Sequence, residues 1–187
     1  YLFQKFIRQG FGTNNVDHCT RLCHASSVAA LMEGIGSGAV SAPFTAAEDS
    51  DCILIIGARP EQNHPVAATY FKQAAKKGKK LIVMDPRRQG LMRLASHPVL
   101  FNAGRDVAML NAMINVIIEE KLYDEQYIQA NVDGFQALSE KVKDFTPEAM
   151  EPVCGVNSEY LRDIARVFAT SNNSIIFWGM GISQHVH

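Results

Sequence analysis

Three short apolar runs place the tightest constraint on how this chain folds. Residues 51–57 (DCILIIG), 80–85 (KLIVMD) and 174–179 (SIIFWG) are each of strand length, and polar residues stand only at their ends. A shorter strand is expected at 98–101. Near-continuous apolar strands are typical of a parallel sheet covered on both faces, whereas half-exposed antiparallel strands alternate apolar with polar residues.

Helices are expected between these strands. The segment from His64 to Lys77 has Asn63 as a candidate N-cap and is followed by Gly78, which favours a helix end. Residues 106–121 carry one apolar stripe at helical spacing. Further helices are expected at 1–9, 24–35, 124–131, 134–143, 147–151 and 158–169. This alternation predicts an α/β fold, a three-layer αβα arrangement with a mostly parallel, doubly wound sheet.

Composition excludes several classes of protein. A formal net charge of −1, with the basic residues scattered, argues against nucleic-acid binding. No apolar run approaches the roughly 18 residues of a membrane helix, and no signal peptide is visible, so a cytoplasmic protein is predicted. Four cysteines in 187 residues are too few for a disulfide scaffold. The chain starts on Tyr1 and stops just after a strand, so we expect a piece of a longer protein.

One cysteine stands in a setting that suits metal chemistry. Cys23 directly precedes an expected helix start, with Arg21 and His24 close by in DHCTRLCHASSV. A helix N-terminus and neighbouring cations favour the thiolate, the form that binds soft metals. The spacing alone is weak evidence for a metal and favours a buried cysteine near a structural histidine. A zinc site would need a second ligand pair, and an iron–sulfur cluster would need several clustered cysteines.

Four loops rich in glycine or charge follow expected strands. They are residues 57–65 (GARPEQNHP), 83–88 (VMDPRR), 101–107 (FNAGRDV) and 178–185 (WGMGISQH). Open parallel sheets bind ligands at the carboxyl ends of their strands, where helix N-termini and arginines suit phosphate. Each loop alone could be a plain strand–helix joint, but together they predict a nucleotide-like ligand. The sequence contains no GxGxxG, so the usual NAD fingerprint is not supported.

These segments resemble a known family. The run CTRLCHASSVAALMEGIGSGAVS resembles the active-site segment of the catalytic (alpha) subunit of molybdopterin-dependent formate dehydrogenases, most closely the soluble, NAD-linked bacterial type. The runs DCILIIGARPEQNHP, KKLIVMDPRR, DVAMLNAMINVIIEEKLYDEQYI and IIFWGMGISQH resemble the same family in the same order. The resemblance implies that residues 1–18 end a preceding domain and that 19–187 form a cofactor-binding α/β domain.

The resemblance also implies a cofactor and a set of site residues. The cofactor is bis-molybdopterin guanine dinucleotide carrying Mo or W. Cys23 occupies the position of the metal ligand, and His24 that of the neighbouring active-site histidine. The residues that would line one guanine dinucleotide arm are Gly57, Glu61, Asn63, Asp85, Pro86, Arg87, Gly104, Asp106, Gly179, Met180, Gly181 and Gln184.

The implied reaction is oxidation of formate to carbon dioxide, with electrons leaving through iron–sulfur clusters to NAD. The 4Fe-4S cluster would lie outside this piece, which alone is expected to be inactive. Implied partners are formate, the rest of the catalytic subunit and iron–sulfur or flavin electron-transfer subunits, with neither nucleic acid nor membrane. Two alternatives stay open: another molybdopterin oxidoreductase, such as a nitrate reductase, or a cofactor-free nucleotide-binding or scaffold module.

Overall fold

A computed structural model describes residues 1–185. The chain falls into two compact units. The first unit is Tyr1–Ser41 together with the chain from Ser183 onward, and the second is Ala42–Ile182. Each is described by itself below.

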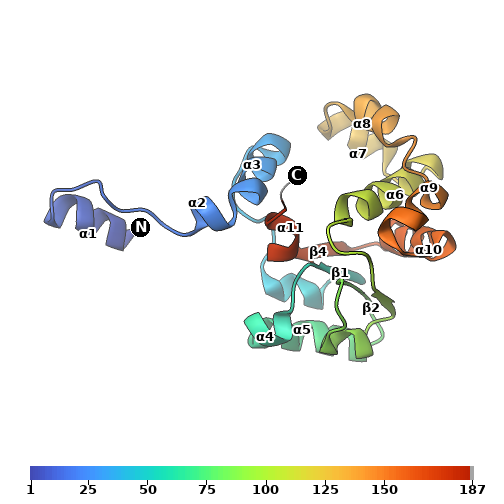
Figure 1. Ribbon diagram of the computed structural model, residues 1–187, viewed down its shortest axis with the longest axis horizontal. Coiled ribbons are helices and arrows are strands. Elements are labelled where there is room, and N and C mark those ends of the chain that lie inside the picture. The colour runs from blue at the N-terminus through green and yellow to red at the C-terminus, as the bar shows by residue number, and fades with distance from the viewer. Residues whose placement is uncertain (186–187) are drawn as a thin grey trace. The chain divides into compact units, whose positions relative to one another are not determined.

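The first unit is helical. It contains α1 (Leu2–Gly10), α2 (Thr20–Cys23) and α3 (Ala25–Ile35), labelled in Figure 1. The predicted helix at 1–9 is confirmed, and a connector without helix follows it to residue 18. The helix predicted at 24–35 is confirmed as α3, whose C-cap is Gly36 at φ +70°, a left-handed conformation that glycine adopts without strain.

The second unit is built on a four-stranded parallel sheet in the order β3-β2-β1-β4. Its strands are β1 (Cys52–Ile56), β2 (Lys80–Met84), β3 (His97–Val99) and β4 (Ser174–Trp178). The predicted parallel sheet is confirmed. The third strand begins one residue before the predicted 98–101 and ends two residues earlier. The central strand β1 is buried along its whole length because it has a strand on each side and helices on both faces.

One face of the sheet is covered by α5 (Pro65–Lys76) and two 3-10 turns, η1 (Phe44–Glu48) and η2 (Gly90–Arg93). Side chains alternate between the faces of a strand, so Ile53 and Ile55 of β1 point to this side. There they join the cluster that contains Phe71 of α5. This layer lies below the sheet in Figure 1.

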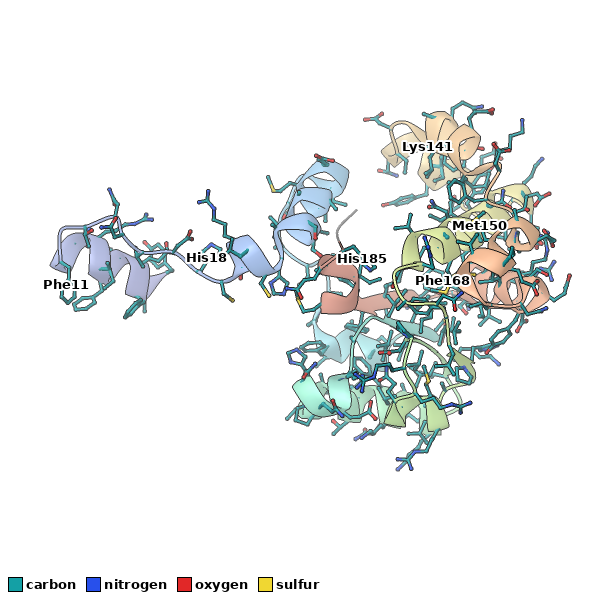
Figure 2. The ribbon with its side chains drawn as sticks, viewed as in Figure 1. Phe11, His18, Lys141, Met150, Phe168 and His185 are labelled. Atoms are coloured by element: carbon teal, nitrogen blue, oxygen red, sulfur yellow. The ribbon has the colours of Figure 1, made fainter. Side chains whose placement is uncertain are left out.

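The other face is covered by α6 (Asp106–Glu119), α9 (Pro147–Cys154) and α10 (Ser158–Ala169). Leu54 and Ile56 of β1 pack there. Figure 2 labels Met150 of α9 and Phe168 of α10, which pack against this second cluster. The predicted three-layer αβα arrangement is therefore confirmed. Three helices outside these layers complete the unit: α4 (Pro60–Asn63), α7 (Glu125–Asn131) and α8 (Phe135–Val142).

Two local expectations need correction. Asn63 is not the N-cap of α5: Pro60 starts the short helix α4, which ends at Asn63, and Pro65 at the first position of α5 makes His64 the N-cap. The segment after the last strand is predicted as a loop, but it contains the short helix α11 (Met180–Ser183), which follows β4 almost directly. Among the helices of residues 1–185, none has the length and apolar character needed to cross a membrane.

Candidate functional site

The order of the strands reverses at one point of the sheet edge. From β1 the chain continues to β2 and β3 on one side, and it then returns to β4 on the other side of β1. In open parallel sheets ligands bind at this point, outside the carboxyl ends of the strands. Gly57 follows β1 there, and Gly179 follows β4.

Glycine allows the backbone segments after β1 and β4 to approach closely. The Gly179 N–H donates to the Ile56 carbonyl at 3.1 Å, and the Gly181 N–H donates to the Gly57 carbonyl at 3.0 Å. A Cβ on Gly181 would lie 2.7 Å from the Gly57 Cα, and one on Gly57 would lie 2.9 Å from the Ile182 nitrogen. The two segments therefore pack backbone against backbone, and glycine at positions 57 and 181 makes this approach possible.

Gly181→Ala is expected to destabilise the chain by about 1–3 kcal/mol, because the new methyl group overlaps backbone that cannot move aside. The measurement is the midpoint of thermal unfolding. Gly34→Ala is the matched control: a Cβ there meets open space within α3, and alanine is favoured over glycine inside a helix by roughly 0.5–1 kcal/mol. Equal midpoints for the two variants would contradict the close approach.

Asp85, at the end of β2, is the most constrained charged residue of this edge. Its side chain is only 6% exposed. Oδ1 accepts from the Arg87 backbone N–H at 2.7 Å, Oδ2 accepts from Gln89 Nε2 at 3.2 Å, and Arg59 Nε lies 3.8 Å from Oδ2. Gln89 Nε2 also donates to the Ala58 carbonyl at 2.9 Å. The Asp85 carboxylate thus ties the loop after β2 to the loop after β1.

Two buried oxygen atoms beside this network lack a donor. Glu61 Oε2 and Gln89 Oε1 are shielded from solvent and have no hydrogen-bond partner among residues 1–185. The other oxygen of Glu61, Oε1, lies against Gly90, where it occupies the space that a side chain would need. A buried acceptor without a donor costs about 1–3 kcal/mol. The pair therefore fits a ligand that brings its own N–H or O–H groups, as a purine base or a ribose does.

The other predicted arm residues are distributed over the neighbouring loops. Gly104 is exposed, at φ +74°, just before α6, and Asp106 is buried as the first residue of that helix. Met180 begins α11. Asn63, Pro86 and Arg87 are exposed on the loops after β1 and β2.

Neither Gln89 nor Arg59 is among the site residues expected from the sequence, although both contact Asp85. Neither residue stands in a recognisable motif. Gln89 lies four residues after Asp85, and only the fold brings its amide to the Ala58 carbonyl.

The first unit contains a second group of functional candidates. We call the side chains of Cys23, His24, Ser26, Ser27, Ser183 and Gln184 the thiol cluster. Cys23 is the last residue of α2, so the expectation that it directly precedes a helix start is corrected: His24 separates the two helices and is the N-cap of α3. The guanidinium of Arg21 lies 3.8 Å from the carboxylate of Asp17.

His24 brings an available nitrogen to the thiol cluster. Its Nδ1 is buried and has no hydrogen-bond partner within residues 1–185. The backbone of His24 is fixed, since its N–H donates to Thr20 O at 2.9 Å and its carbonyl accepts from the Val28 N–H at 2.9 Å. The backbone at His24 is thus fixed directly after Cys23, and the imidazole carries one buried ring nitrogen without a partner within residues 1–185.

The remaining cysteines differ from Cys23. Cys52 and Cys154 are fully buried in the core, and burial raises the pKa of the Cys52 thiol, which keeps it protonated and unreactive. Cys19 is exposed, one helical turn before Cys23.

The donor set suits a metal that arrives with other ligands. Within the described part of the chain, no three histidine, cysteine or acidic side chains gather in a way that could hold a metal ion. The thiol cluster can therefore offer a metal one sulfur, from Cys23. A single protein thiolate fits a metal whose other ligands belong to a cofactor, as the family resemblance implies.

Comparison with known proteins gives a consistent result. The family model described as molybdopterin oxidoreductase matches residues 1–187. The chain is 39% identical to formate dehydrogenase H of Escherichia coli over 98% of its own length and 26% of that protein. It is also 39% identical to the F420-dependent formate dehydrogenase subunit alpha of Methanocaldococcus jannaschii, over 100% of its length and 28% of that protein.

A solved structure resembles this fold closely. Acetylene hydratase from Pelobacter acetylenicus superposes with a TM-score of 0.82 at 29% sequence identity, over 97% of this chain and 24% of that one. The chain thus spans about a quarter of the length of each of these three proteins.

Proposed function

The chain belongs to the molybdopterin oxidoreductase family, and we propose that it is the cofactor-binding part of the catalytic subunit of a formate dehydrogenase. The observation that carries this proposal is the pair Cys23–His24, a half-buried thiol followed by an imidazole whose Nδ1 has no partner within residues 1–185. The similarity to formate dehydrogenase alpha subunits at 39% identity supports formate as the substrate.

The proposed cofactor is bis-molybdopterin guanine dinucleotide with Mo or W. The Cys23 thiolate would ligate the metal. In the second unit, the loops after β1 and β2 would bind one dinucleotide arm, with Glu61 Oε2 and Gln89 Oε1 as two acceptors for its hydrogen-bond donors. When bound, the cofactor supplies a metal centre that takes up two electrons.

The overall reaction converts formate to carbon dioxide, one proton and two electrons. The chain's own residues have two tasks in it. Cys23 holds the metal through its sulfur, and His24 accepts or returns a proton beside it, since an imidazole can do both near neutral pH. Asp85 and its loop partners hold the cofactor rather than act on formate.

The proposal extends to the parent protein. Electrons would leave through a 4Fe-4S cluster outside this chain and pass through iron–sulfur or flavin subunits to NAD, as in the bacterial NAD-linked type. Residues 1–18 would complete a preceding domain, and residues 19–187 would form the domain that binds the guanine dinucleotide. The exposed apolar side chains of α1, Leu2, Phe3 and Phe6, support that assignment, because they need another surface to cover them.

Asp85→Ala in the parent enzyme is expected to lower cofactor content more than it lowers turnover per bound metal. The variant removes a buried carboxylate that orients Arg59 and Gln89, and a hydrogen bond to a charged group is worth about 1.5–3 kcal/mol. The measurements are metal and pterin content per subunit beside formate kinetics. Asp133→Ala, at an exposed aspartate, is the control. Wild-type content in the Asp85 variant would remove this residue from the cofactor site.

A second candidate is another reaction on the same cofactor. The structural similarity to acetylene hydratase, whose name describes a hydration, favours this second candidate. The test is to purify the parent, determine Mo, W and pterin, and assay dye reduction with formate and dye oxidation with nitrate. Metal with formate activity supports the proposal, metal with another activity supports the second candidate, and absence of metal and pterin supports a cofactor-free module.

A further inference from the structure

Two serines, Ser26 and Ser27, fix the position of Ser183, the residue that precedes Gln184. The Ser26 hydroxyl donates to the Ser183 carbonyl, and the hydroxyl oxygens of Ser27 and Ser183 lie 2.5 Å apart. Ser183 is only 6% exposed. The start of α3 and the end of α11 are therefore held together within the first unit.

This attachment brings the Gln184 side chain to Cys23. Gln184 Nε2 lies 4.0 Å from Cys23 Sγ, within the range of an N–H···S hydrogen bond. A carboxamide N–H is a donor, and a cysteine sulfur accepts, more strongly as a thiolate. The carboxamide carries no charge of its own, so it can orient the sulfur without competing as a metal ligand.

We infer that Gln184 is a positioning residue for the Cys23 sulfur, rather than a residue that lines a dinucleotide arm. In metal sites, hydrogen bonds to a ligating sulfur fix its orientation and shift the reduction potential of the metal. The part of the inference that concerns the metal rests on the proposed function. The contact itself does not, and it can be tested on this 187-residue chain without cofactor.

Nuclear magnetic resonance of the isotope-labelled chain tests the contact. The side-chain amide signals of Gln184 are assigned by their loss in Gln184→Leu. Cys23→Ala is expected to shift these signals, because it removes the sulfur acceptor. Cys19→Ala, one helical turn away, is expected to leave them in place. Equal responses to the two substitutions, or none to either, would overturn the inference and leave the proposed role of Cys23 untouched.

The second measurement uses the parent enzyme. Gln184→Leu is expected to keep the metal but move its midpoint potential to a more negative value, because a sulfur that has lost a hydrogen-bond donor gives more electron density to the metal. Gln126→Leu, the same substitution at an exposed site on α7, is expected to leave the potential unchanged. The readout is a redox titration followed by electron paramagnetic resonance.

The outcomes separate the two claims. An unchanged potential in Gln184→Leu would overturn the positioning role, and loss of cofactor in that variant would instead make Gln184 an arm residue. A parent that contains neither Mo nor W would contradict the proposed function. The shift of the Gln184 amide signals in the isolated chain would still establish the contact with Cys23.

Discussion

Cys23→Ala in the parent enzyme is expected to abolish formate oxidation. The substitution removes the one sulfur that the thiol cluster offers to the metal, and Cys52 and Cys154 cannot replace it because they are fully buried in the core of the second unit. Loss of a protein ligand changes the geometry and the reactivity of the metal together, so the effect falls on turnover itself rather than on formate affinity. The measurement is formate-dependent dye reduction per subunit, with metal content determined on the same sample.

Cys19→Ala is the matched control for this experiment. Cys19 is the N-cap residue of the same helical turn, is exposed, and would lose the same thiol group. We expect it to retain activity. Equal loss of activity in the two variants would mean that both substitutions act by disturbing the helical turn α2, and that the Cys23 sulfur has no specific role.

His24→Ala is expected to keep the metal yet slow turnover. The backbone of His24 is held by its hydrogen bonds to Thr20 and Val28, which the variant retains, so α2 and α3 should remain in place. What the variant loses is an imidazole whose Nδ1 has no partner within residues 1–185. General acid–base assistance is typically worth about 10²–10⁴-fold, which sets the size of the expected loss in kcat. The measurement is steady-state kinetics on samples of known metal content.

His18→Ala is the corresponding control, because His18 is exposed and its ring lies 4.0 Å from the adjacent Asp17 carboxylate. It should leave kcat unchanged. A His24 variant with normal kcat would assign this residue to structure alone. A His24 variant without metal would instead place it among the groups that hold the cofactor.

Most of the fold could be predicted because its signals are local. Asn157 and Thr146 accept hydrogen bonds from the backbone N–H groups of Tyr160 and Ala149, as their positions before α10 and α9 predict. The apolar strands predicted a parallel sheet because burial on both faces leaves no polar alternation to find. Asn63 failed as a predicted cap because Pro60, three residues earlier, starts a separate short helix that ends at Asn63, and the capping preference of a single residue carries no information about that.

The candidate site was only partly visible in the sequence. The glycines near the ends of β1 and β4 stood out in the sequence. The structure needs glycine there because two backbone segments about 120 positions apart approach closely, and that approach depends on the strand order β3-β2-β1-β4. The same holds for Gln89, whose amide joins two loops, and for Gln184, which the resemblance assigned to a cofactor arm and the fold brings to Cys23. Contacts between polar side chains that are far apart in the chain leave no periodic pattern and no motif in the sequence.

The central claim is that Cys23 ligates a molybdenum or tungsten centre. X-ray absorption at the metal edge tests it most directly, on the parent enzyme and its Cys23→Ala variant prepared side by side. The account predicts that the wild type shows a metal–sulfur shell and that the variant loses one sulfur from it. An identical sulfur shell in the two proteins, together with near-normal formate oxidation by the variant, would contradict it.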